Sequence, residues 1–294
     1  MTSRRLILAT LLATLAPPTP AAAAEPPLRV VASFSILADI ARNVGGDRVV
    51  VTALVGPDAD AHVYDPRPSD IATLARADVL LTNGLGFEGW MDRLVGSSGF
   101  RGRRVVAAAG IEPLPADGHD DPHAWQDPRI VERYVNRISA ALAAIRPADA
   151  ASFAVNAERY RRELRALDAE IRRAVDTLPP ERRRFVTSHD AFGYFARRYG
   201  FTILAPQGWS TDDEASARDV AALIRQLKAG SVRAVFIENM TDPRLIERIA
   251  AEGGATVGGR LYSDALAQPG EPAGTYLGMM RHNLATLLAA LRGP

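Results

Sequence analysis

The sequence predicts an α/β protein with two lobes, each built on a mainly parallel sheet flanked by helices and joined by one long helix. Short apolar, β-branched segments alternate with amphipathic helical patterns along the chain, which is typical of parallel βαβ units. One unbroken helical pattern interrupts this alternation near the middle. The chain also has no cysteine, so core burial must stabilise it, and 294 residues suffice for two medium cores.

Residues 1–24 are predicted to be an export signal rather than part of the fold. Arg4 and Arg5 precede an apolar segment from Leu6 to Leu15, and a run of alanines ends at Ala24. The apolar segment is shorter than the ~20 residues that a membrane-spanning helix needs. Because no cysteine is present to carry a lipid, we expect the mature protein to be soluble in the periplasm and not lipid-anchored.

The N-terminal lobe is expected to span residues 25–146. Its predicted strands are Leu28–Ala32, Val49–Ala53, Asp78–Thr82 and Arg104–Ala107. Its predicted helices are Ile36–Val44, Ser69–Ala75, Glu88–Leu94 and Arg129–Ile145. Asp127 and Pro128 form a capping residue followed by a proline at the first helical position, so they mark the start of the last helix.

The linker, residues 147–179, is expected to be one continuous helix. From Ala148 to about Leu178 the pattern contains neither glycine nor proline, and it ends at Pro179 and Pro180. Its many charged residues are interpreted as a solvated helix face with i,i+4 pairs, in preference to a partner surface. A stiff helix between two lobes should limit their closure to small tilts.

The C-terminal lobe, residues 180–294, repeats the same alternation. Its predicted strands are Phe185–Ser188, Phe201–Leu204, Val232–Ile237 and Ala255–Val257. Its predicted helices are Ala191–Tyr199, Ser216–Ala229, Pro243–Glu252 and Thr275–Leu291.

The charge balance argues against a nucleic-acid partner. The chain carries 35 basic and 34 acidic residues, a formal net charge of +1, and its basic residues are scattered. No apolar segment after the signal is long enough to cross a bilayer.

Four polar residues follow predicted strands, and ligands of open α/β sheets bind beyond the carboxyl ends of strands. These residues are His62, His123, His189 and Asp264. Three imidazoles and one carboxylate without a thiolate indicate zinc before copper(I), whereas manganese prefers more oxygen. Four protein ligands close the coordination shell, which argues against an enzyme, and no His-Glu-x-x-His motif is present.

Each of these residues also has a simpler interpretation when taken alone. His62 could be a hydrogen-bonding surface group, Asp264 a turn residue, and His189 part of a helix cap. His119 is interpreted as a mobile loop residue rather than a permanent ligand. Behind the ligands, carboxylates should fix the histidine tautomers, and the candidates are Asp65, Asp190 and Glu238.

Four segments resemble ligand motifs of the solute-binding proteins of zinc and manganese ABC importers. They are residues 56–68 (GPDADAHVYDPRP), 121–125 (DPHAW), 188–195 (SHDAFGYF) and 261–266 (LYSDAL), in the order that the family has them. The resemblance extends over the whole mature chain, including the linker helix.

This resemblance implies a metal held between two lobes and delivered to a membrane ABC permease. Histidine at position 189 fits the zinc members, whereas an aspartate at position 264 occurs in manganese members and in some zinc members, so both metals stay open. Many zinc members carry a long histidine-rich loop before the second ligand, and here only His119 is present. Because this chain lacks such a loop, a periplasmic metallochaperone could deliver the metal as a second partner. The protein itself is expected to be monomeric.

Two other functions are weighed against metal capture. A secreted zinc hydrolase would need an open coordination position and a general base, and a receptor for an organic solute would use the histidines to bind a carboxylate. For a metal receptor, affinity should fall as the pH drops through about 6, because the histidines must be neutral to bind.

Overall fold

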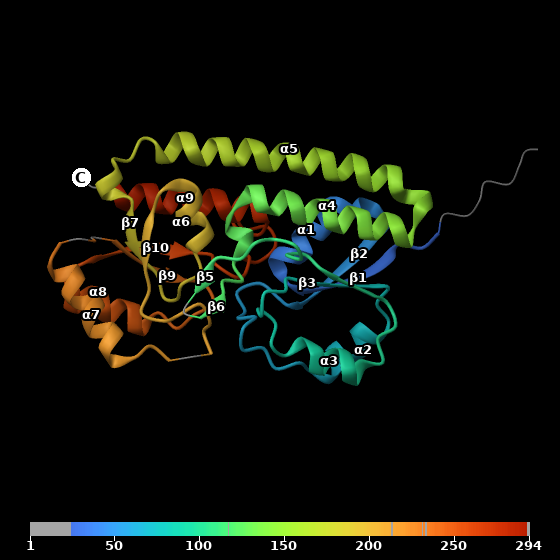
Figure 1. The fold of residues 1–294 in the computed structure, drawn as a ribbon, viewed down its shortest axis with the longest axis horizontal. Helices are drawn as coiled ribbons and strands as arrows, with labels where there is room; N and C mark the ends of the chain where they lie inside the picture. Colours follow the sequence, from blue (N-terminus) through green and yellow to red (C-terminus); the bar gives the residue numbers. More distant parts are fainter. Residues whose placement is uncertain (1–24, 117, 213, 231, 233, 293–294) are drawn as a thin grey trace, which may run out of the picture.

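The computed structural model describes residues 25–116, 118–212, 214–230, 232 and 234–292. The predicted signal peptide, residues 1–24, lies outside the described residues. Two four-stranded parallel sheets form the two lobes, and a long helix runs along both (Figure 1). The predicted fold class is confirmed. Within the described residues, no helix combines the length and the apolar character needed to cross a bilayer.

The N-terminal sheet has the strand order β2-β1-β3-β4, all parallel. Its elements are β1 (Leu28–Phe34), α1 (Ser35–Gly45), β2 (Val49–Val55), α2 (Pro68–Ala75), β3 (Val79–Thr82), α3 (Met91–Ser98), β4 (Arg103–Val106) and α4 (Pro128–Ile145). As predicted, the Asp127 side chain caps α4, accepting a hydrogen bond from Arg129 N at 2.8 Å.

The C-terminal sheet has the order β10-β9-β7-β8, again parallel. Its elements are β7 (Arg184–Val186), α6 (Gly193–Tyr199), β8 (Thr202–Leu204), α7 (Ala217–Lys228), β9 (Ala234–Glu238), α8 (Arg244–Gly253), β10 (Thr256–Leu261) and α9 (Tyr276–Leu291). Counted within each lobe, both sheets follow the order second, first, third, fourth. The two lobes therefore repeat one topology.

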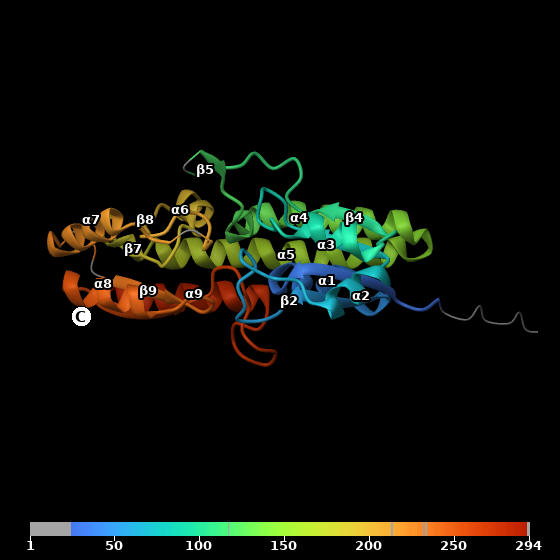
Figure 2. The same ribbon diagram turned by 90° about the horizontal axis from the view of Figure 1, so that it is seen from below.

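The linker helix is α5 (Ala150–Val175), 26 residues long. At 1.5 Å per residue it spans about 39 Å, enough to cover both lobes, as Figure 2 shows from below. Its buried stripe includes Phe153, Tyr160 and Leu164 and packs against α1, α4 and α9.

The chain reaches back to the N-terminal lobe after β10. Leu266 N donates to Ser35 Oγ at 2.9 Å, and Tyr276 N, at the start of α9, donates to the buried Asp39 carboxylate at 2.9 Å. The lobes are thus tied on two sides, by α5 and by the segment that leads into α9.

Three local features differ from the sequence prediction. The helix expected at Glu88–Leu94 begins only at Met91, because the half-buried Glu88 side chain accepts backbone hydrogen bonds from the preceding loop. Strand β10 continues past Val257 through Gly258, where a Cβ atom would lie 2.7 Å from Phe236 and Ala290 side chains, so only glycine permits this close packing. A short hairpin of β5 (Pro115–Ala116) and β6 (His119–Asp120) was not predicted.

Candidate metal centre

The structure brings all four predicted site residues together between the lobes. One ligand atom from each of His62, His123, His189 and Asp264 lies within 4.8 Å of the others. His62 lies in the loop after β2 and His123 in the long connection after β4, whereas His189 and Asp264 follow β7 and β10. Each lobe contributes two side chains from the carboxyl ends of its strands, which is where ligands of such sheets bind.

Several distances between the ligand atoms are close to those around a tetrahedral ion, and all of them are at most 4.8 Å. Asp264 Oδ2 lies 3.2 Å from His62 Nε2 and 3.1 Å from His189 Nε2, and Asp264 Oδ1 lies 3.6 Å from His123 Nε2. The Nε2 atoms of His123 and His189 are 3.4 Å apart. Ligands about 2.05 Å from a tetrahedral zinc ion are about 3.3 Å from one another. The four side chains therefore surround a space that fits one such ion.

Several of these ligand atoms lack hydrogen bonds. Among the described residues, His62 Nε2 and both carboxylate oxygens of Asp264 are buried without a hydrogen-bond partner. Buried polar atoms are normally satisfied, and leaving one unpaired costs about 1–3 kcal/mol. A cation bound at the centre would satisfy all three, so the donor set fits a metal.

The centre is shielded from water, and its charges are coupled. His123, His189 and Asp264 are fully buried, and the His62 side chain is 1% exposed. Burial alone lowers the pKa of His123, but Asp264 and Asp121 outweigh it and raise this pKa to about 9. The same balance, with Glu238 and Asp264, holds the pKa of His189 well above its usual value.

The other two groups shift in the opposite direction. Burial lowers the pKa of His62, against the influence of Asp264. Burial raises the pKa of Asp264, but the charges of His189 and His123 outweigh it and hold the pKa well below its usual range. Without metal, the protonated imidazoles of His123 and His189 balance the charge of the Asp264 carboxylate, although the geometry leaves its oxygens without a hydrogen bond.

Asp121 orients His123. Its Oδ1 atom accepts from His123 N at 2.9 Å and lies 2.8 Å from His123 Nδ1. A carboxylate only accepts, so Nδ1 carries the proton and Nε2 faces the centre. Sequence reasoning missed this role, although an aspartate two residues before a histidine is the usual spacing of a side-chain to backbone turn.

In the C-terminal lobe, Glu238, the last residue of β9, lies beside His189, which follows β7 of the same sheet. Its Oε2 atom lies 2.8 Å from His189 Nδ1, while Oε1 accepts from the backbone N atoms of Ser188 and His189 at 2.8 and 3.0 Å. Glu238, one of the three predicted candidates, therefore lies beside a ligand histidine. The other two predicted candidates, Asp65 and Asp190, are exposed. The carboxylate beside His123 is that of Asp121, which was not among the candidates.

The loop of His62 is held by groups from both lobes. Asp60 Oδ1 accepts from His62 N at 2.8 Å, and its Oδ2 accepts from Thr211 Oγ1 of the C-terminal lobe at 2.7 Å. Trp90 Nε1 donates to Ala61 O at 2.8 Å. The ring of Phe87 packs edge-on against the His62 ring, 4.7 Å between centroids.

The loop of Asp264 is tied to the loop of His123. Trp125 Nε1 and Gln126 Nε2 both donate to Ser263 O at 2.8 Å. Because residues adjacent to one ligand bind the backbone adjacent to another, the two lobes hold the centre as one unit.

The remaining histidines lie outside the centre. His119 is exposed in the β5–β6 hairpin, and its ring centroid lies 5.4 Å from that of Trp209. His282 packs edge-on against Tyr262.

Comparison with known proteins places the chain in a family. The family model described as "Zinc-uptake complex component A periplasmic" (ZnuA) matches residues 30–290. The chain belongs to the ZnuA family.

Relatives in this family carry different metals in their names. Manganese-binding lipoprotein MntA of Bacillus subtilis (strain 168) is 38% identical over 279 residues, 92% of this chain and 91% of that protein. Zinc-binding protein TroA of Treponema pallidum (strain Nichols) is 37% identical over 282 residues, again 92% and 91%.

Solved structures show the same fold. The periplasmic zinc-binding protein TroA from Treponema pallidum superposes with a TM-score of 0.87 at 34% identity, covering 91% of this chain and 99% of that one. The manganese-bound periplasmic metal-binding protein from Candidatus Liberibacter asiaticus has a TM-score of 0.82 at 30% identity, covering 90% and 99%. Homologues in this family are metal ABC transporter substrate-binding proteins, such as the one named manganese ABC transporter substrate-binding lipoprotein PsaA of Streptococcus pneumoniae.

Proposed function

We propose that this protein captures Zn²⁺ between its lobes and delivers it to an ABC permease. The ligands are His62, His123, His189 and Asp264. The observation that supports this most strongly is that ligand atoms of all four residues lie within 4.8 Å of one another, with His62 Nε2 and both Asp264 oxygens buried and without a hydrogen bond. The ion is the transported substrate, and the family membership supports the transport role.

Zinc is preferred because of the donor set. Three imidazoles and one carboxylate suit a borderline ion that accepts four ligands, whereas manganese favours more oxygen ligands. Asp121 and Glu238 contact the Nδ1 atoms of His123 and His189, which face away from the centre. These two carboxylates therefore do not add oxygen ligands to the ion. The centre therefore offers nitrogen-rich coordination.

Manganese is the second candidate, and one observation favours it. Asp264 turns both oxygens toward the histidines: Oδ2 is within 3.2 Å of two of them, and Oδ1 is 3.6 Å from the third. If both oxygens bound the ion, the site would supply three nitrogens and two oxygens. A higher oxygen share and coordination number suit manganese better than zinc.

The same arrangement supports binding rather than hydrolysis. A catalytic zinc site keeps one position for water and places a free general base beside it. Here four side chains enclose the ion, and the neighbouring carboxylates of Asp121 and Glu238 are engaged with histidines. We therefore propose a receptor and not an enzyme.

We place this receptor in the periplasm, following the family description, with the permease as its transient membrane partner. The absence of any cysteine supports a receptor without a lipid anchor, although the MntA relative is named a lipoprotein. The monomeric state and a metallochaperone partner stay predictions.

Metal competition is the decisive experiment. Purified protein stripped with a chelator is titrated with zinc and with manganese against an indicator of known affinity, and its melting is followed in parallel. Zinc at a thousand times Kd should stabilise the fold by ~4 kcal/mol. Tighter manganese binding would reassign the metal, and the absence of any metal-dependent shift that His123→Ala removes would overturn the site.

A further inference from the structure

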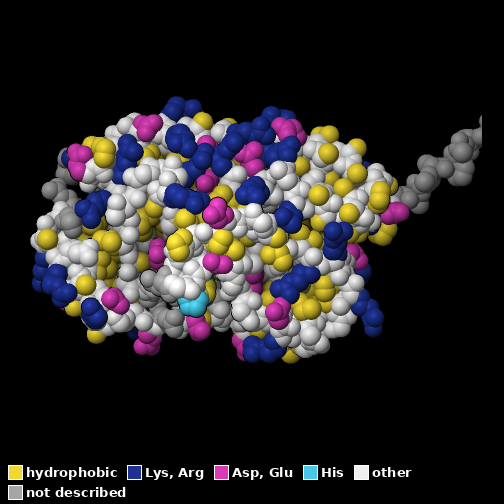
Figure 3. Space-filling model, viewed as in Figure 1, with side chains coloured by type: hydrophobic (Ala, Val, Ile, Leu, Met, Phe, Trp, Pro, Cys, Tyr) yellow, Lys and Arg dark blue, Asp and Glu magenta, His cyan; other side chains and the backbone are white. Residues whose placement is uncertain are grey.

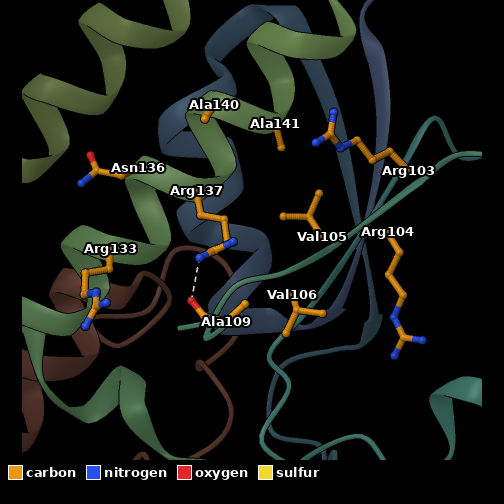
Figure 4. A pocket seen from close by; sticks show the side chains of 10 residues that line it. All are labelled: Arg103, Arg104, Val105, Val106, Ala109, Arg133, Asn136, Arg137, Ala140 and Ala141. Carbon is orange, nitrogen blue, oxygen red and sulfur yellow. Dashed lines mark hydrogen bonds between the residues drawn. The ribbon is translucent and has the colours of Figure 1, made fainter. Parts of the chain in front are cut away.

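A cavity of about 650 Å³ lies on the outer edge of the N-terminal lobe, between β4 and α4 (Figure 4). It is lined by Arg103, Arg104, Val105, Val106, Ala109, Arg133, Asn136, Arg137, Ala140 and Ala141. None of these residues belongs to the metal centre. We call this cavity the β4 groove.

One wall of the β4 groove is the open edge of a sheet. Strand β4 is the last strand in the order β2-β1-β3-β4, and four consecutive residues of it, 103–106, line the cavity. Arg103 N donates inward to Asp78 O at 3.0 Å, and Ala107 N donates inward to Thr82 O at 2.8 Å. Since alternate residues of a strand point their backbone groups to opposite sides, the N–H groups of Arg104 and Val106 face outward. Among the described residues they have no acceptor.

The groove is strongly basic. Arg103 and Arg104 come from β4, Arg133 and Arg137 from α4, and all four are exposed. Its lining includes no carboxylate among the described residues, whereas the pocket between the lobes contains Asp60 and Asp242. Figure 3 shows that arginine side chains, interspersed with acidic ones, also gather over the neighbouring helices α4 and α5.

The two arginines of α4 are held in place. Arg133 Nη2 donates to Gly110 O at 2.7 Å, and Arg137 Nη2 donates to Ala109 O at 2.6 Å, the bond drawn in Figure 4. Each guanidinium has five N–H donors, so each keeps others for a ligand. Arg104 is the one groove arginine paired with a carboxylate, that of Asp92.

We propose that the β4 groove binds an extended, acidic segment of a partner protein, which adds as a further strand beside β4. The outward N–H groups supply backbone pairing, and the half-buried side chain of Val106 packs against an apolar residue of the segment. The arginines accept its carboxylates. Arginines on this edge also repel the same edge of a second copy, so the groove selects a partner of opposite charge.

The test uses the full chain and a fluorescein-labelled peptide of alternating glutamate and valine, with binding followed by fluorescence anisotropy. The acidic peptide should bind, and a lysine–valine peptide of equal length should not. Arg133→Gln with Arg137→Gln should weaken binding at least about tenfold, since two charge-assisted contacts are lost. The matched control removes two exposed arginines of α7, Arg218→Gln with Arg225→Gln, and should leave binding unchanged.

A second arm separates strand addition from simple anion binding. A glutamate–valine peptide with methylated backbone nitrogens keeps its carboxylates but loses its N–H donors, and it should bind at least about tenfold more weakly. Equal binding of the methylated peptide, or displacement of the acidic peptide by millimolar inorganic phosphate, would overturn strand addition. Equal weakening by the α7 control variant would show that only net charge is sensed, which also overturns the proposal. Zinc titration of each variant verifies that the metal centre is intact.

Discussion

The two lobes share one strand order, yet they position their histidines with different carboxylates. In the C-terminal lobe the buried Glu238 lies at the end of the third strand and contacts His189 directly, 2.8 Å from its Nδ1 atom. In the N-terminal lobe the half-buried Glu88 follows the third strand, but it accepts from Ser33 Oγ, Asn83 N and Gly84 N. Glu88 therefore stabilises a loop, while Asp121 orients His123.

This difference shows how a buried carboxylate is accommodated. Near Glu238 the protonated His189 balances the charge, whereas Glu88 has only neutral donors, and burial raises the pKa of Glu88. Glu88 still reaches the centre indirectly, because Asn83 Nδ2 donates to Pro122 O at 2.9 Å, one residue before His123. We infer that Glu238 acts on metal affinity and Glu88 mainly on stability.

The largest expected effect comes from Asp264, whose carboxylate lies near ligand histidines of both lobes. Asp264→Asn removes the carboxylate that pairs with His123 and His189, so zinc affinity should fall by more than the roughly 100-fold expected for a change behind the ligands. Competition titration measures it. A loss below tenfold would contradict the assignment of Asp264 as a ligand.

Zinc binding should release protons at neutral pH. The pKa of His123 is raised to about 9 and that of His189 lies well above its usual value, so both are protonated without metal and must be neutral with it. Affinity should therefore fall as the pH drops below about 9, by up to about 100-fold per pH unit while two protons are displaced. This window is higher than the value of about 6 expected from ordinary imidazole.

Calorimetry in buffers of different ionisation enthalpy counts these protons. About two per zinc ion are expected near pH 7.5. Asp121→Asn should reduce the number, because Asp121 helps to raise the pKa of His123. If zinc binding released no protons at this pH, His123 and His189 would not be protonated in the metal-free protein.

A matched pair of variants tests the comparison of the lobes itself. Glu238→Gln should lower zinc affinity about 10- to 100-fold, because it removes the acceptor behind His189. Glu88→Gln should change affinity less but reduce stability by about 1–3 kcal/mol, since an amide NH₂ group would face backbone donors. Titration and denaturant unfolding of both separate the two roles. Equal affinity losses would erase the distinction between the lobes.

The smallest effect is expected where the lobes touch behind His123. A Cβ atom at Gly193, at the start of α6, would lie 2.6 Å from Asp121 Oδ2. Gly193→Ala should displace the Asp121 side chain. Zinc affinity should fall by less than about 10-fold, which is the smallest loss expected when a carboxylate behind a ligand is removed altogether. Gly208→Ala, where a Cβ meets nothing within 4 Å, is the control and should bind like the wild type.

The sequence predicted most of the fold, and it pointed to four site residues that the structure brings together. The alternation of strands and helices, the capped start of α4 at Asp127 and the continuous α5 are local patterns, and local patterns survive folding. The predicted ends of helices and strands were wrong where a contact with a distant residue determines them. Glu88 leaves the predicted helix for a buried hydrogen-bond network, and β10 extends because Gly258 permits packing against Phe236.

By itself the sequence determined the α/β class, the linker and the kind of donor set, because these depend on residue type and spacing. Only the tertiary structure decided the protonation of the centre and the acceptors behind it. Asp121 and Asp264 are far apart in sequence, as are His189 and Glu238, and their effect on pKa depends on distances of a few ångströms. Those distances are set by how the two lobes pack across α5 and α9, which no local pattern encodes.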